Sequence, residues 1–303
     1  MTSDRRNVPE SIRARLLNLS RDRHEDFNLT LSRYVAERFL YRLGQSAYRE
    51  RHVLKGAMLL TVALDDMRYR PTRDVDVLRS GAIDRESIHE DISAICAVNG
   101  GPDGLRFDAS QLILEEIRER NRYRGMRIKV PATLGSARLT LQIDMGFGDA
   151  VYPAPTTLAI ESLLDLDGPQ VLAYPLEAVI AEKLEAMVSI GMLTSRMKDF
   201  YDIYAIASVR SLEIGPLVTS ISTTFQRRGT ILPDAVPPVL SDAMPDDPAK
   251  VTQWAAFLRR LGRTAEELPL YRVVARAEEF LRVVWDSTLA DSVSVWSPES
   301  GWH

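Results

Sequence analysis

Cysteine and histidine are scarce in this sequence of 303 residues, which contains one cysteine and four histidines. A single cysteine excludes a disulfide within the chain, and four histidines leave little material for a zinc site. Cys96 lies in the apolar run ISAICAV and is interpreted as a core residue.

Long apolar runs are also missing, and none approaches the roughly 20 residues of a membrane-spanning helix. The first residues, MTSDRRNVPESIRARLL, are charged and lack the apolar centre of a signal peptide. We therefore expect a cytoplasmic, reduced protein with no membrane partner. The composition, 45% hydrophobic and 26% charged, is typical of a globular chain of one large or two modest domains.

An excess of positive charge is absent, since the formal net charge is −4, whereas duplex-DNA binders are usually basic. The stretch IRERNRYRGMRIK (117–129) is an exception with six cations and one acid. It is either a solvated face or a phosphate-binding surface, and the pair Arg227 and Arg228 raises the same question. The cations of the stretch are Arg118, Arg120, Arg122, Arg124, Arg127 and Lys129.

Several common catalytic motifs are missing: the Walker lysine motif, the Rossmann glycine fingerprint, the kinase set and the Gly-x-Ser-x-Gly elbow. The patterns that are present predict an α+β fold. Helices are expected over the first fifty residues, ending near Gly44, and a strand, a turn and a helix over HVLKGAMLL. A strand is expected in PTRDVDVL, a helix over 87–98, a loop over 100–105 and several strands over 105–147.

The segments VYPAPTT and LLDLDGPQVLAYP are predicted to break this structure and lead away from the sheet. From Pro175 onward the pattern is helical, with one helix ending near Gly191 and a second over SRMKDFYDIYAIASV. The predicted domains are therefore 1–170, a core with leading helices over 1–50, and 171–303, a helical domain.

Two aspartates, Asp74 and Asp76, are spaced so that both side chains lie on one face of an extended segment, with Val75 and Val77 on the other. Adjacent carboxylates repel unless a cation lies between them, and Mg²⁺ prefers oxygen ligands. The pair is thus either half of a metal site or two exposed acids that protect an edge strand from aggregation.

A third acid strengthens the metal interpretation. In RLTLQIDMGFGD the apolar residues alternate with polar ones, so Asp144 lies opposite the buried face. If its strand neighbours that of Asp76, three carboxylates converge and can hold metal ions that clamp a nucleotide's phosphates. Gly56 would let the backbone approach a phosphate closely.

The helical region adds a second cluster. Lys183 falls within an apolar helical stripe, so it either extends its amine to solvent or has an anionic partner such as a triphosphate. Asp199 and Asp202 share one helix face, with Arg196 and Lys198 nearby. These four residues are either a salt-bridged surface or part of a site that faces Asp76.

Six segments in this order resemble the AbiEii/AbiGii toxin family of type IV toxin-antitoxin and phage-exclusion systems. They are VLKGAMLL, RPTRDVDVL, LQIDMGFGD, AEKLEAMV, SRMKDFYDI and TFQRRGT, and the likeness runs from about Arg51 to Arg228. The resemblance implies a DNA polymerase β-like nucleotidyltransferase core with a mixed sheet, followed by a helical C-terminal domain.

The resemblance also implies function. A family member uses a nucleoside triphosphate with Mg²⁺, or Mn²⁺ in its place, and some add nucleotides to the 3′ end of tRNA and so block translation. The expected partner is an AbiEi-like winged-helix antitoxin. Asp74, Asp76 and Asp144 match the metal acids, Lys183 a triphosphate-binding lysine, and Asp202 a catalytic aspartate with Asp199 beside it.

The turn Gly56-Ala57-Met58 departs from the family, in which many relatives carry a hydroxyl residue that touches the phosphate. Backbone N–H groups, Lys55 or Arg73 could bind the phosphate instead, and Arg196 and Lys198 are further candidates for nucleotide binding. The alternatives to tRNA transfer are transfer to a protein or small molecule, or a nucleotide-binding regulator without turnover.

Overall fold

The computed structural model describes residues 7–65, 72–119 and 123–303. Contacts divide the chain into two compact units. Unit 1 comprises Met1–Val62, Pro71–Asp149 and Pro155–Ala173, and unit 2 comprises Ala63–Arg70, Ala150–Ala154 and Tyr174–His303. The domain boundary after residue 170 stays a prediction, because compactness does not test independent folding.

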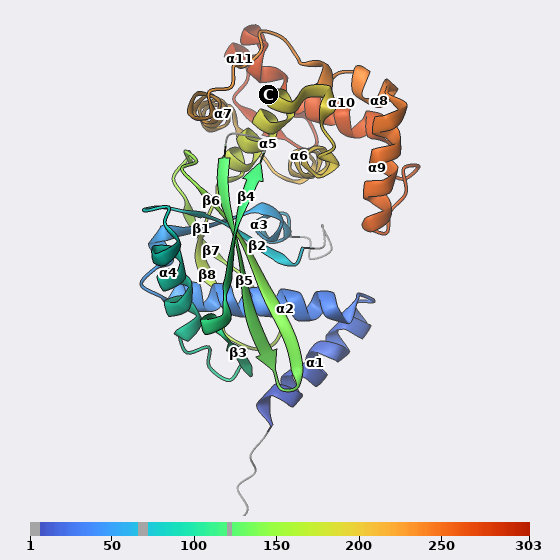
Figure 1. The fold of residues 1–303 in the computed structure, drawn as a ribbon. Helices are drawn as coiled ribbons and strands as arrows, with labels where there is room; N and C mark the ends of the chain where they lie inside the picture. The colour runs from blue at the N-terminus through green and yellow to red at the C-terminus, as the bar shows by residue number, and fades with distance from the viewer. Residues whose placement is uncertain (1–6, 66–71, 120–122) are drawn as a thin grey trace, which may run out of the picture. The chain divides into compact units, whose positions relative to one another are not determined.

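Unit 1 is built on a mixed sheet with helices packed against it (Figure 1), which confirms the α+β fold class. Its helices are α1 (Val8–Asp22), α2 (Phe27–Gln45), α3 (Gly56–Ala63) and α4 (Arg85–Ala97). Its strands are β1 (His52–Lys55), β2 (Asp74–Arg79), β3 (Leu105–Phe107), β4 (Ile113–Glu119), β5 (Tyr123–Leu134), β6 (Ala137–Phe147), β7 (Thr156–Ala159) and β8 (Gln170–Ala173).

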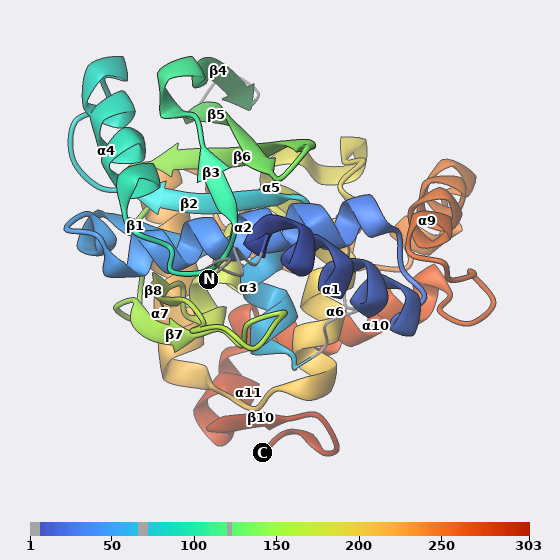
Figure 2. The same ribbon diagram turned by 90° about the horizontal axis from the view of Figure 1, so that it is seen from below.

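The described strands form an eight-stranded sheet in the order β3-β5-β6-β2-β1-β8-β7, with β4 also paired to β5. The β2–β6 and β1–β8 pairs are parallel, and the other pairs are antiparallel. Helix α2 packs against β6 and β8, so it crosses the sheet (Figure 2). The parallel β2–β6 pair brings together the two strands that carry the predicted acids.

Alternation along the central strands separates a core face from a polar face. Val75 and Val77 of β2 are buried, as are Ile143 and Met145 opposite them on β6, whereas the aspartates between them are only half-buried. This is the period of two expected for a sheet with one covered face. The predicted burial of the valines is therefore confirmed.

The end of β2 is anchored to α4. Arg79 is buried, and its Nε donates a hydrogen bond of 2.8 Å to Oδ2 of Asp91, which is also buried. A paired, buried charge of this kind is costly to move because separation would leave each partner unsatisfied. This anchor holds the strand that carries Asp74 and Asp76.

Helix α2 ends at Gln45, next to the predicted stop at Gly44. A Cβ at Gly44 would lie 2.4 Å from the carbonyl oxygen of Gln170, so the glycine serves the close approach of α2 to β8. The segments predicted to leave the sheet instead supply β7 and β8, and β8 pairs with β1. Short strands next to proline have weak local signals, and here long-range pairing decides.

Unit 2 is mainly helical. Its helices of one turn or more are α5 (Leu176–Ile190), α6 (Met197–Val209), α7 (Ile214–Arg228), α8 (Ala243–Asp246), α9 (Pro248–Arg260), α10 (Leu270–Leu281) and α11 (Ser287–Ser292). As predicted, α5 follows Pro175 and ends at Gly191, whose φ of 59° suits glycine. Among the described residues, none of the helices is long and apolar enough to cross a membrane.

A small sheet in unit 2 was not predicted. It has the order β11 (Gly301–Trp302), β10 (Val295–Ser297) and β9 (Leu212–Glu213). Trp296 and Trp302 pack around Phe280 with ring centroids 5.0 and 5.9 Å from it, and the indole of Trp296 donates to the carbonyl of Ala207. These aromatic contacts join the end of the chain to α6 and α10 of the same unit.

Candidate active site

Four charged side chains form a continuous row across the polar face of the unit 1 sheet. Lys55 is the register partner of Asp76, Asp76 of Asp144, and Asp144 of Arg127. Directly paired residues on neighbouring strands point to the same face of a sheet. We call these residues of β1, β2, β6 and β5 the charged row. Its order is cation, acid, acid, cation.

Asp74 lies beside the charged row. It is two residues before Asp76 on β2, on the same face, and its register partner on β6 is Gln142. The three acids were expected to converge if the strand of Asp144 neighbours that of Asp76. The parallel β2–β6 pairing confirms that the two strands are neighbours. The roles of the three acids stay predictions.

Arg127 binds Asp144 through both oxygens. Its Nε and Nη2 donate hydrogen bonds of 2.8 and 2.6 Å to Oδ1 and Oδ2, and Gln142 adds a longer contact of 3.4 Å to Oδ1. These bonds raise the pKa of the Arg127 guanidinium, which is thus a fixed cation. The sequence had placed Arg127 only in a basic stretch, because pairing with a residue 17 positions away has no local signal.

Lys55 has its own carboxylate partner at the other end of the charged row. Its Nζ lies 3.0 Å from Oδ2 of Asp149, whose side chain is 8% exposed. Gly146 lies beside this pair, since a Cβ there would be 3.5 Å from Nζ. The sequence did not single out Asp149, although it ends the segment LQIDMGFGD.

The turn at Gly56 is in contact with Asp76. Gly56 has a φ of 74°, and a Cβ on it would lie 2.0 Å from Oδ2 of Asp76. Glycine is therefore required both by the backbone conformation and by the space that the carboxylate occupies. Ala57 is buried in α3, and the binding of phosphate by this turn stays a prediction.

The other cations predicted for unit 1 differ in their surroundings. Arg73 is exposed, and its Nη2 lies 3.9 Å from Oδ1 of Asp26. Lys129, in the basic stretch, makes an ion pair of 2.9 Å with Glu115 on the neighbouring strand. Arg120 and Arg122 lie outside the described residues. The stretch therefore contains at least two cations that are paired with acids of unit 1.

Unit 2 contains a second cluster, in which Lys183 of α5 lies between two aspartates of α6. Its Nζ is 3.1 Å from Asp199 Oδ1 and 2.5 Å from Asp202 Oδ2, and both carboxylates are at most 1% exposed. The anionic partner predicted as one alternative for Lys183 is thus present within the protein. The salt bridges of the other alternative are also present, but Asp199 and Asp202 are buried and do not lie on the surface.

Electrostatic balance keeps Asp199 ionised in this cluster. Burial opposes the charged form, but the charges of Lys183 and Arg196 outweigh it and lower the pKa of the Asp199 carboxyl. Arg196 contributes directly, with Nε 2.5 Å from Oδ2. Lys198 is exposed on the first turn of the same helix.

The second arginine of the pair in TFQRRGT is also paired within unit 2. Arg228 donates from Nη1 to Oε2 of Glu185 at 2.8 Å, and its side chain is 14% exposed. The hydroxyl of Thr230 binds the other oxygen of Glu185. A structural role for Arg228 at the end of α7 explains these contacts better than binding of nucleic acid.

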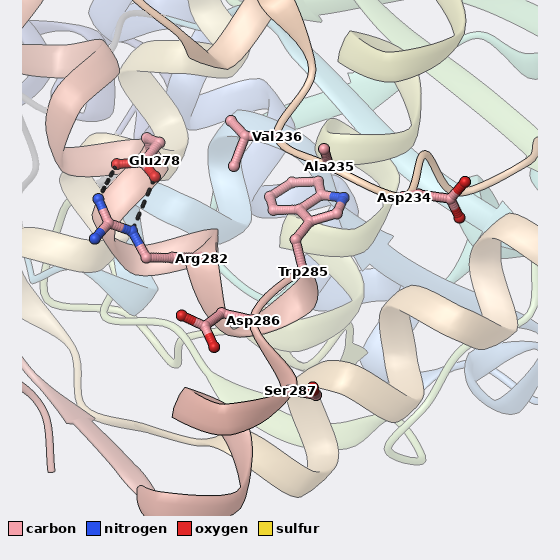
Figure 3. A pocket seen from close by; sticks show the side chains of 8 residues that line it. All are labelled: Asp234, Ala235, Val236, Glu278, Arg282, Trp285, Asp286 and Ser287. Carbon is pink, nitrogen blue, oxygen red and sulfur yellow. Dashed lines mark hydrogen bonds and ion pairs between the residues drawn. The ribbon is translucent and has the colours of Figure 1, made fainter.

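A surface cavity of about 390 Å³ in unit 2 is lined by none of the predicted site residues (Figure 3). The ring of Trp285 lies beside Val236, and Arg282 is joined to Glu278 by an ion pair of 2.8 Å. Both charged groups already satisfy each other. We therefore place the candidate site at the charged row and not in this cavity.

The acids of the polar face fit Mg²⁺ in the type of their donor atoms. Asp74, Asp76 and Asp144 offer the oxygen ligands that this ion prefers, from neighbouring register positions. Within the described residues, however, no three acidic, histidine or cysteine side chains lie close enough together to hold a metal ion as they are. Both oxygens of Asp144 are bonded to Arg127 on the side away from Asp76.

Comparison with known proteins agrees with the order of motifs along the chain. The model of the family described as "Nucleotidyl transferase AbiEii toxin, Type IV TA system" matches residues 38–283, which is most of the sequence. The chain therefore belongs to this family of nucleotidyltransferase toxins. The type IV toxin-antitoxin system implies an antitoxin partner and a nucleoside triphosphate substrate.

Solved structures give weak likenesses. JHP933 from Helicobacter pylori is 13% identical with a TM-score of 0.49, over 88% of this chain and 96% of that one. A candidate nucleotidyltransferase from H. pylori is also 13% identical, with a TM-score of 0.47 over 84% and 93% of the two chains. No curated protein matches the sequence.

Proposed function

We propose that this toxin transfers a nucleotide from a nucleoside triphosphate to the 3′ end of tRNA in a Mg²⁺-dependent reaction that blocks translation. The observation that carries the proposal is the register match of Asp76 with Asp144, with Asp74 on the same face. Like charges on paired strands destabilise a sheet. Lys55 and Arg127 flank the two acids, and a bound dication would offset the repulsion between the acids directly.

Asp74, Asp76 and Asp144 are the residues that would hold Mg²⁺. When bound, this ion neutralises phosphate charge and favours displacement at the α-phosphate by a hydroxyl, with pyrophosphate as the leaving group. Lys55, held by Asp149 at 3.0 Å, presents a point charge at the same face for a phosphate oxygen. Gly56 and Ala57 offer backbone N–H groups at the start of α3, and Arg73 adds a positive charge before β2.

Lys183 is the proposed triphosphate ligand of unit 2. Asp199 and Asp202 accept hydrogen bonds from its amine and so keep it protonated and oriented. Arg196 supports Asp199, and the exposed Lys198 is placed to meet a phosphate. Asp202 is the proposed catalytic aspartate of this cluster.

The partners follow from the same proposal. The antitoxin is of the AbiEi-like winged-helix kind, and the protein acts in the cytoplasm, where tRNA and triphosphates are available. The acceptor is tRNA in preference to a protein, because the chain carries a local basic stretch over 117–129.

The test is incubation of the purified protein with total tRNA, Mg²⁺ and each labelled nucleoside triphosphate in turn. Asp76→Ala is the matched inactive variant, and omission of Mg²⁺ is the second control. Label on tRNA from the unmodified protein alone supports the proposal and identifies the nucleotide. Label on protein would move the acceptor to a side chain, and nucleotide binding without transfer to any acceptor would favour a regulator.

A further inference from the structure

We infer that Arg127 is a resident cation that competes with the metal ion for Asp144, so that the acid site is complete only when the Arg127–Asp144 pair opens. This inference rests on the proposed metal role of Asp144. It concerns how the same site is controlled, and it assigns a function to a residue outside the proposed ligand set.

The first support is the direction of the pair. β6 lies between β5 and β2, so Arg127 and Asp76 lie on opposite sides of Asp144. The guanidinium of Arg127 donates one hydrogen bond to each carboxylate oxygen of Asp144, from Nε to Oδ1 at 2.8 Å and from Nη2 to Oδ2 at 2.6 Å. A bidentate bond of this kind fixes the plane of the carboxylate as well as its position. Asp144 is thereby drawn toward β5, and no set of three acids is gathered around one point in the described residues.

The second support is charge. Among the described residues, the acids of this face are accompanied by the cations Lys55, Arg127 and Lys129. Arg127 binds one of the proposed ligands itself, through both oxygens of Asp144. A dication that approaches Asp144 therefore meets a positive charge in direct contact with its ligand, and Coulomb repulsion at a few ångströms opposes binding.

The third support is exposure. The side chains of Arg127 and Asp144 are 36% and 21% exposed, so the pair can open without unpacking the core. A partly exposed pair has a modest net stability, because water replaces the lost bonds. Arg127 is thus held firmly enough to orient Asp144 but not buried in a way that would make the pair permanent.

Lys129 provides a matched control for Arg127. It lies two residues further along β5, on the same face, and its ion pair is with Glu115 of β4. Its register partner on β6 is Gln142 and not an acid. Removal of its charge releases Glu115, the register partner of Arg127 on β4, but it removes neither of the bonds between Arg127 and Asp144.

The experiment is titration of Mn²⁺, without nucleotide, into the full-length protein, followed by the loss of the free-ion electron paramagnetic resonance signal. We expect Arg127→Gln to bind Mn²⁺ about tenfold more tightly than the unmodified protein, the factor that a charge-assisted pair represents. Lys129→Gln should change the affinity by about twofold or less. Arg127→Lys keeps the positive charge but cannot make the two parallel hydrogen bonds, so its affinity for Mn²⁺ should be intermediate.

Unchanged or weaker binding in Arg127→Gln overturns the inference, as does an equal gain in Lys129→Gln, which would indicate a general charge effect. If Arg127→Gln does not fold by circular dichroism, Arg127→Lys decides, and affinity equal to that of the unmodified protein overturns the inference. Mn²⁺ binding that Asp76→Ala abolishes but Arg127→Gln leaves unchanged would refute only this inference. Absence of Mn²⁺ binding in every variant would refute the proposed metal site together with it.

Discussion

The two charged clusters of this protein contain the same residue types in opposite settings. In unit 1 the two acids of the charged row, Asp76 and Asp144, are half-buried on a sheet face between Lys55 and Arg127. In unit 2 Lys183 and Arg196 face Asp199 and Asp202, which are fully buried between helices.

The difference separates two uses of charge. A balanced, buried cluster cannot lose a member cheaply, because the remaining charge would be left without a partner in a poorly polarisable interior. In a half-exposed cluster water screens the charges and replaces lost contacts, so its members can exchange a partner for a ligand at a lower cost. We therefore expect substitutions in unit 2 to affect folding first, and substitutions in the charged row to affect ligand binding first.

The largest expected effect is on stability, from Lys183→Met. This change keeps much of the side-chain volume but leaves Asp199 and Asp202 without their shared cation, at a cost of about 3–5 kcal/mol in the free energy of unfolding. Urea denaturation followed by circular dichroism measures it. Lys198→Met, an exposed lysine of the same cluster region, should cost about 0.5 kcal/mol or less.

Urea denaturation of Asp76→Asn tests whether the charged row differs from the unit 2 cluster in this way. Asp76 is half-buried, so water can replace the contacts of its carboxylate, and stability should change little while Mn²⁺ binding is lost. If Asp76→Asn destabilises the protein as much as Lys183→Met, the charged row is a structural element and not a ligand site.

An intermediate effect is expected from Gly56→Ala. The added Cβ must displace the carboxylate of Asp76, and the φ of 74° is unfavourable for alanine, so we expect a loss of about 1–3 kcal/mol. Gly101→Ala is the matched control, since Gly101 has a φ of 70° with no atom within 4 Å of an added Cβ. The control should lose only the backbone part, about 1 kcal/mol. If thermal denaturation shows the same loss of stability in both variants, the contact between Gly56 and Asp76 does not contribute to the effect.

The smallest effect is the pH dependence of the unit 2 cluster. The pKa of Asp199 is lowered in the folded protein, so the unfolded chain binds its proton first as pH falls. The stabilisation from Asp199 is complete above the ordinary aspartate pKa of about 3.9 and is lost as pH falls below it, through the lowered folded value. Urea midpoints measured from about pH 5 down to pH 3 should decrease, and the slope should be shallower in Asp199→Asn. An identical slope in both proteins would contradict this assignment.

Much of the architecture was predictable because its signals are local. The helix after Pro175, its end at Gly191, and the strand of Asp74 and Asp76 follow from periodicity and from the conformational preferences of proline and glycine. The strands β7 and β8 were missed, since four-residue strands beside prolines are stabilised by pairing with distant strands.

The candidate site was predictable to the same degree. Alternation along a strand placed Asp144 on the polar face, and the order of motifs along the chain predicted the family that the comparison shows. Arg127 and Asp149 were not identified as site residues, because their partners Asp144 and Lys55 are 17 and 94 positions away. Ion pairs over such separations depend on strand order and register, which no single segment encodes.

The sequence by itself determined which residues share a face, because the period of a strand and the period of a helix are properties of the local backbone. It therefore determined that Asp74 and Asp76 project together and that Lys183 lies within an apolar stripe. Tertiary structure decided what each of these side chains meets. The parallel pairing of β2 with β6 placed Asp76 beside Asp144, and the antiparallel pairing of β6 with β5 placed Arg127 opposite Asp144. Register is set by the burial of whole strand faces, so these contacts arise only when the sheet has formed.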